Sequence, residues 1–202
     1  EIRGAGTLLG ESQSGHLEAV GYDLYCKMLS MAIKNLREDK EEDLLDTFET
    51  EIKINMDAFI PPQYISSESQ KLEMYKKIAA IGSKEDYMDM QDELVDRYGD
   101  IPQPVMDLLM VAYIKARAHA CYVEELSAGE EKIIFKIIPK APANGNGLMP
   151  LLDAFGGRLA YDRALPGFIY KERGKLRMDA SEQVVAINEV LAKLKEHLFP
   201  ES

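Results

Sequence analysis

The sequence contains no tryptophan, and it has only two cysteines among 202 residues. Two cysteines are too few for a scaffold held together by disulfides. Cys26 and Cys121 each stand in an apolar, helix-like context, so we expect both to be buried, reduced thiols. No window holds the roughly eighteen unbroken apolar residues that a membrane-spanning helix needs. These absences favour a cytoplasmic protein without a membrane partner.

Positive charge is also scarce. Lysine and arginine together number 24, against 35 aspartate and glutamate residues, which gives a formal net charge of −11. A module that holds nucleic acid by itself normally shows a basic stripe, because phosphate contacts dominate that affinity. The acidic balance therefore argues against DNA binding by the bulk of the chain. It favours either a basic protein partner or plain solubility.

Catalytic signatures are lacking as well. The histidines His16, His119 and His197 are scattered, and none stands at metal-ligand spacing from a cysteine or a carboxylate. The sequence has neither a Gly-x-Ser-x-Gly nucleophile elbow nor a glycine-rich phosphate loop of the Walker type. We therefore expect no catalytic residue, no metal site and no cofactor in this chain alone.

What the sequence does have is a glycine-punctuated segment at its start, which opens without an initiator methionine. We expect the chain to be a piece of a longer protein. Arg3 and Gln13 lie in this segment, where four glycines permit backbone conformations that other residues avoid: Gly4, Gly6, Gly10 and Gly15. Arg3 can clamp a phosphate or an acidic side chain, and Gln13 can hydrogen-bond a base edge, a backbone group or water. From the residues alone, a structural loop whose Arg and Gln satisfy backbone carbonyls remains the stronger interpretation.

Two parts are predicted along the chain. Residues 16–37 keep an approximate 3.6-residue apolar period, which predicts a long helix. The charge run at 38–43 is typical of a solvated linker. We place the boundary there, so that residues 1–45 form one part and residues 46–202 form another.

The second part predicts an α+β fold. Polar and apolar residues alternate over 49–56, which favours a half-buried strand. Capping residues, glycines and prolines then predict three helices, from Ser67 to Gly82, from Ser83 to Tyr98 and from about Val105 to Cys121.

Strand-like segments dominate after these helices. They are predicted at 132–138, 158–161, 167–170 and 175–178, with a short helix at 148–155. Asp179 and Glu182 form a capping signal for a last amphipathic helix. The expected fold is therefore a set of helices followed by a small antiparallel sheet and a closing C-terminal helix.

The second predicted helix carries carboxylates at helical spacing. Successive members stand three or four positions apart, which places them on one face: Asp86, Asp89, Glu93, Asp96 and Asp100. Only Lys84 and Arg97 lie nearby in sequence to offset their repulsion. Two interpretations stay open, a solvated face of an acidic protein or a surface that docks onto an arginine-rich partner.

Three stretches of the sequence resemble a known family. Glu-Ile-Arg-Gly-Ala-Gly at 1–6, with Gln-Ser-Gly-His at 13–16, resembles the end of the translocation motif of the bacterial transcription-repair coupling factors. Asp-Ala-Phe-Ile-Pro-Pro-Gln-Tyr-Ile at 57–65 and Asp-Glu-Leu-Val-Asp-Arg-Tyr-Gly at 92–99 are similar to the same family. The resemblance covers residues 1 to about 120, and the sequence after Val123 is generic. Thr7, Ser12 and Pro62 depart from the expected residues but remove neither a charge nor a glycine.

The resemblance implies a parent protein that is an ATP-driven translocase on double-stranded DNA. Such a protein displaces stalled RNA polymerase and recruits nucleotide-excision repair. Its ATP and Mg²⁺ would bind motifs upstream of this chain. Arg3, Gln13 and the four glycines match motif positions that couple nucleotide state to movement on DNA.

The resemblance also implies that residues from about 46 onward form a C-terminal regulatory domain. In this family that domain folds back on an N-terminal module that resembles the repair helicase subunit, and it masks the surface for the damage-recognition ATPase. Glu93 and Asp96 match the acidic docking positions. Two alternatives stay open, a scaffold that supports the motor and a module that contacts DNA itself.

Overall fold

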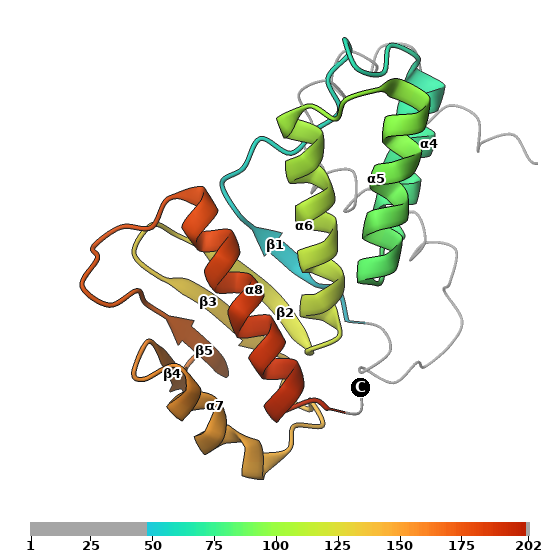
Figure 1. Cartoon of the computed structure of the whole chain (residues 1–202). Coiled ribbons are helices and arrows are strands. Elements are labelled where there is room, and N and C mark those ends of the chain that lie inside the picture. Colours follow the sequence, from blue (N-terminus) through green and yellow to red (C-terminus); the bar gives the residue numbers. More distant parts are fainter. Residues whose placement is uncertain (1–47, 201–202) are drawn as a thin grey trace, which may run out of the picture.

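The computed structural model describes residues 48–200 and shows a mixed sheet with helices packed across one face (Figure 1). Arg3, Gln13, the four glycines, the predicted helix at 16–37 and the proposed boundary near residue 45 lie outside the described residues. Predictions on them therefore stay predictions.

Five strands make up the sheet of the described part, in the order β1-β2-β3-β5-β4. Their bounds are β1 Glu51–Lys53, β2 Val123–Ala128, β3 Ile133–Ile137, β4 Leu159–Asp162 and β5 Gly167–Tyr170. The pair β1–β2 is parallel, and the other three pairs are antiparallel. The α+β fold class with its closing helix is confirmed, and β1 adds one parallel edge strand to the expected antiparallel sheet.

The helices fall into two groups. α4 (Glu68–Ala79) and α5 (Lys84–Tyr98) form a helical end of the molecule beside α6 (Gln103–His119). α6 and α8 (Ala180–His197) run across the same face of the sheet, and the short α7 (Leu148–Ala154) lies near the end of α8 (Figure 1). A 3₁₀ turn at Gly145–Gly147 precedes α7.

Local sequence explains where these helices begin. The Ser83 hydroxyl accepts a hydrogen bond from the Asp86 N–H, and the Asp86 carboxylate accepts one from the Ser83 N–H, which completes a capping box for α5. Asp179 and Glu182 form the same arrangement at α8, as predicted. Gly99 then follows α5 with φ of 82°, a conformation that favours glycine.

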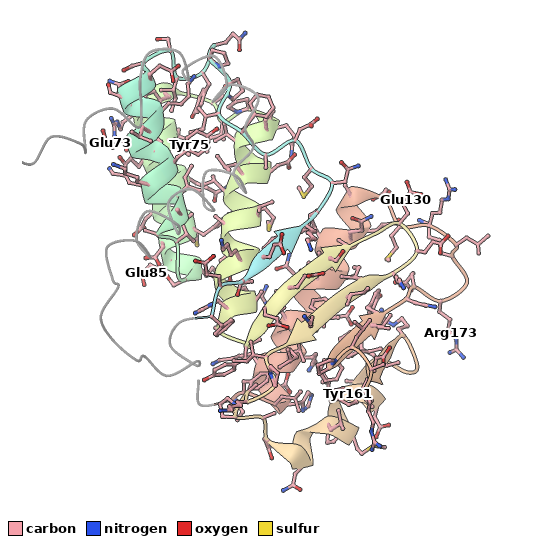
Figure 2. All side chains as sticks on the ribbon, turned by 180° about the vertical axis from the view of Figure 1, so that it is seen from behind. Glu73, Tyr75, Glu85, Glu130, Tyr161 and Arg173 are labelled. Atoms are coloured by element: carbon pink, nitrogen blue, oxygen red, sulfur yellow. The ribbon has the colours of Figure 1, made fainter. Side chains whose placement is uncertain are left out.

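The core lies between the sheet and its covering helices. A cross-strand row joins four buried side chains, because their registers align: Ile52, Leu126, Phe135 and Phe168. Leu108, Ile114, Ile187 and Leu191 of α6 and α8 are fully buried in the same cluster. Burial of this apolar surface is the main stabilising contribution. Figure 2 shows the opposite side of the sheet, with the strands in front of α6 and α8.

The predicted strands differ from the structure at three places. The strand predicted over 49–56 spans only Glu51–Lys53. Val123–Ala128 is a strand that the sequence pattern did not indicate, because a bulge between Val123 and Glu125 separates the buried Val123 and Leu126 by three positions instead of two. Residues 175–178 are not a strand. They form a loop in which the Met178 N–H donates to the Glu130 carbonyl (N···O 2.6 Å) and Arg177 pairs with Glu130.

Residues 48–200 lack two kinds of feature. No helix there combines the length and hydropathy that crossing a membrane requires. No group of three or more His, Cys, Asp or Glu side chains in this range is placed to hold a metal ion.

Candidate functional site

Helix α5 presents one face to the core and the opposite face to solvent. Met90 and Leu94 are buried, and Tyr87 packs its ring against Tyr113 of α6 with centroids 5.3 Å apart. The Tyr64 hydroxyl lies 3.2 Å from the carbonyl oxygen of Leu94 and holds the end of the helix. These contacts fix the rotation of α5, so its outward face is set by the fold.

Two of the five predicted docking carboxylates, Asp86 and Asp100, are not part of the outward-facing stripe of α5. The Asp86 carboxylate accepts hydrogen bonds from the backbone N–H groups of Gly82 (3.0 Å) and Ser83 (2.9 Å). Hydrogen bonding to the Gly82 backbone, followed by hydrogen bonding to the Ser83 side chain, lowers the pKa of Asp86. Asp100 lies beyond the last helical residue, Tyr98, so it does not continue the stripe. Asp86 therefore caps the start of α5, and Asp100 lies after its end.

Glu93 is half-buried and forms ion pairs with two cationic side chains of the same chain. Its Oε1 lies 2.6 Å from Lys77 Nζ on α4 and 2.8 Å from Arg97 Nη1 one turn later on α5. Hydrogen bonding to Lys77 first, and to Arg97 second, lowers the pKa of Glu93. The same hydrogen bond raises the pKa of Lys77. Sequence spacing indicated Arg97 as a neighbour of Glu93, but it gave no sign of Lys77, which comes from another helix.

Asp89 and Asp96 are exposed on the outward face of α5. Neither contacts a cation within the part of the chain that the structure describes. The structure adds Glu85 and Asp92 to this face, since both are exposed and stand at helical spacing from Asp89 and Asp96. The sequence already contained this signal, because the spacing of 85, 89, 92 and 96 is as regular as that of the predicted stripe.

Two exposed apolar side chains border these carboxylates. Met88 is 53% exposed and Val95 is 47% exposed, and they stand two helical turns apart on α5. We call Glu85, Met88, Asp89, Asp92, Val95 and Asp96 the outer face of α5. It combines apolar contact area with carboxylates that pair with no cation in residues 48–200, which suits a cationic protein surface. Figure 2 labels Glu85 of α5 and Glu73 of α4 at the helical end of the molecule, away from the sheet.

Two other titratable side chains of the described part, His119 and Arg158, make contacts that hold the fold together. The ring of His119 stacks on Phe48 with centroids 4.2 Å apart, and burial, followed by the charge of Lys115, lowers its pKa. Arg158 pairs with Glu189 of α8 (Nη2···Oε1 3.2 Å) and hydrogen-bonds the Tyr170 hydroxyl (2.9 Å). The Thr50 hydroxyl lies 3.2 Å from His119 Nδ1 and donates a hydrogen bond to the Val123 carbonyl oxygen (2.8 Å), so its proton is held by the backbone of the adjacent strand.

Comparisons with known proteins agree with this picture. Residues 54–148 match the family model of the TRCF domain. The transcription-repair-coupling factor of Staphylococcus epidermidis is 40% identical over 146 residues, which make up 72% of this chain and 12% of that protein. The transcription-repair-coupling factor of Bacillus subtilis is 37% identical over 160 residues, or 78% of this chain and 13% of that protein. The chain thus spans a small part of the length of the curated relatives it matches.

A solved structure extends the likeness to the fold. The C-terminal domain of a transcription-repair coupling factor superimposes with a TM-score of 0.57 at 25% identity, covering 74% of this chain and 95% of that one. That coverage includes more of the chain than the family model alone. The chain therefore belongs to the family of the bacterial transcription-repair coupling factors, within the C-terminal part that carries the TRCF domain.

Proposed function

We propose that this chain is the regulatory C-terminal part of an ATP-dependent DNA translocase that displaces stalled RNA polymerase and recruits nucleotide-excision repair. In this proposal the outer face of α5, with Glu93 beside it, docks on the N-terminal repair-helicase-like module of the same protein. Docking masks the surface that recruits the damage-recognition ATPase. Release on engaging the polymerase then exposes that surface.

The observation that carries the proposal is the exposure of Asp89, Asp92 and Asp96 on a rigidly held helix. Like charges at this spacing destabilise a helix by about 0.2–0.5 kcal/mol per pair. A cationic partner would convert that repulsion into attraction. Met88 and Val95 supply apolar area at the same place, where burial contributes roughly 25 cal/mol per Å².

The energy required is modest. Coupling between a docking site and a distant function typically spans about 1–3 kcal/mol. One charge-assisted hydrogen bond contributes about 1.5–3 kcal/mol before desolvation costs are subtracted. A few contacts between the outer face and arginine side chains therefore suffice to hold an inhibited state that remains reversible.

The direct test is binding of the 202-residue chain to the separate N-terminal module of its parent, at low and moderate salt. Wild type is compared with the Glu93→Lys, Asp96→Lys double variant. The matched control is Glu131→Lys, Asp153→Lys, which makes the same charge change at two exposed positions outside α5. We expect salt-sensitive binding that the first variant abolishes and the second retains. Equal loss in both variants would leave only a general charge effect.

The N-terminal segment has a separate proposed role. Arg3 and Gln13, with Gly4, Gly6, Gly10 and Gly15, would couple ATP hydrolysis in the parent to movement along DNA.

A regulatory domain and a scaffold predict opposite results when residues 46–202 are deleted from the parent. Deletion of a regulatory domain leaves the ATPase equal or more active, whereas deletion of a scaffold cripples it.

A further inference from the structure

Two cations contact the same oxygen atom of Glu93. Lys77 Nζ and Arg97 Nη1 lie 2.6 Å and 2.8 Å from Oε1, and Glu93 is the residue of the proposed docking pair that faces α4. An arginine from a partner binds a carboxylate best through two parallel N–H···O bonds, one to each oxygen. That geometry is not open at Glu93 while Lys77 and Arg97 hold Oε1.

A second acceptor for both cations lies next to Glu93. Glu73 Oε1 on α4 is 3.5 Å from Lys77 Nζ and 3.3 Å from Arg97 Nη1. The side chains of Lys77 and Glu73 are 42% and 49% exposed, so the ammonium group has room to turn from one carboxylate to the other. Arg97 is more restrained, because its guanidinium lies over the ring of Tyr98 at 5.2 Å from the centroid.

We propose that Lys77 competes with a partner arginine for Glu93 and so lowers the affinity of the docking site. When the arginine binds, Lys77 moves to Glu73 and leaves the Glu93 carboxylate open. This inference rests on the proposed docking function. Lys77 thus sets the affinity of the docking site, and Glu73 accepts the Lys77 ammonium group when it leaves Glu93. A site weakened in this way binds reversibly, as a clamp that must release requires.

The test measures binding of the 202-residue chain to the N-terminal module of its parent at low salt. Lys77→Gln removes the competitor. Lys76→Gln is the matched control, because Lys76 is exposed in the same turn of α4 and is not one of the cations on Glu93. We expect Lys77→Gln to tighten binding about two- to fivefold, the range that an exposed ion pair permits. Lys76→Gln should give a distinctly smaller change.

A double-mutant cycle then ties the gain to Glu93. In a Glu93→Gln background, Lys77→Gln should no longer tighten binding more than Lys76→Gln does. Glu73→Gln should weaken binding in wild type and weaken it less once Lys77 is replaced, because only Arg97 then uses the second acceptor. Circular dichroism of each variant verifies that the fold is retained.

The outcomes separate the two proposals. Wild-type binding that Asp96→Lys abolishes, with equal effects of Lys77→Gln and Lys76→Gln, overturns the competitor and leaves the docking function standing. A gain from Lys77→Gln that persists without Glu93 overturns it as well. Absence of any wild-type binding overturns the docking function and the competitor together.

Discussion

Arg117 near the end of α6 donates a hydrogen bond to the backbone carbonyl oxygen of Asn188 in the middle of α8, with an N···O distance of 3.1 Å. A second guanidinium nitrogen contacts the Asn188 side-chain oxygen. The Asn188 amide in turn donates to the Val184 carbonyl at 2.9 Å. One side chain therefore joins the two helices that cover the sheet, although they are far apart in sequence.

Replacing Arg117 by Met should destabilise the fold. The substitution removes both contacts to Asn188 and leaves the amide oxygen of Asn188, which is half-buried, without its donor. The expected loss in the free energy of unfolding is about 1–3 kcal/mol. Urea unfolding followed by circular dichroism measures it. Arg163→Met, at an exposed position between β4 and β5, should change stability by less than about 0.5 kcal/mol.

A substitution at Gly167 tests the pairing of β3 with β5. A Cβ at this position would lie 2.1 Å from the Phe135 carbonyl oxygen, which belongs to the neighbouring strand and cannot simply turn away. Gly167→Ala should therefore destabilise by about 1–3 kcal/mol. Gly145→Ala is the control, since a Cβ there meets nothing within 4 Å. Equal melting temperatures for the two variants would contradict the strand pairing described here.

Sequence patterns predicted the parts of the fold that local signals control. Ser83, and Asp179 with Glu182, marked helix starts that the structure confirms, because a helix cap is satisfied within four residues. Periodicity also found β3 and β5. It missed β2, where the bulge at Val123 breaks the alternation, and it made a strand of 175–178, whose position is decided by contacts with Glu130.

The candidate site was predictable to a similar extent. Spacing along α5 indicated Asp89, Glu93 and Asp96, because one helix determines which of its residues share a face. The ion pair from Lys77 to Glu93 depends on how α4 packs beside α5, and nothing in the spacing of either helix reveals it. The sequence spacing also allowed Glu85 and Asp92 to be predicted on this face. An equally regular set that includes Asp86 and Asp100 was predicted instead.

The thiol of Cys121 should resist alkylation in the folded chain. It is buried, it contacts the Leu191 carbonyl oxygen at 3.6 Å, and burial raises its pKa to about 11. The thiolate is the reactive form, so little of it is present at pH 8. In a Cys26→Ser variant, iodoacetamide should label Cys121 slowly without denaturant and rapidly in urea. Rapid labelling of the native protein would show that the contact between Cys121 and Leu191 of α8 opens readily.

Acid should remove the contribution of Glu93 to stability. Its pKa in the folded chain lies below the ordinary value of 4.5, because Lys77 and Arg97 favour the charged carboxylate. The contribution is therefore complete above the ordinary pKa, and it is lost as the pH falls below about 4.5 through the lowered value. Glu93→Gln should reduce the free energy of unfolding by about 0.2–1 kcal/mol at pH 7, a partly exposed pair being this weak.

Urea unfolding of wild type and Glu93→Gln at several pH values between 7 and 3 measures this difference. It should shrink steadily below pH 4.5, because wild type loses a charge that the variant never had. Asp92→Asn is the control, since Asp92 is exposed on the same helix and is not the carboxylate that Lys77 and Arg97 contact. It should leave stability at pH 7 unchanged or slightly higher, because it relieves repulsion on the outer face. A difference between wild type and Glu93→Gln that stays constant with pH would show that Glu93 contributes by packing, with no role for its charge.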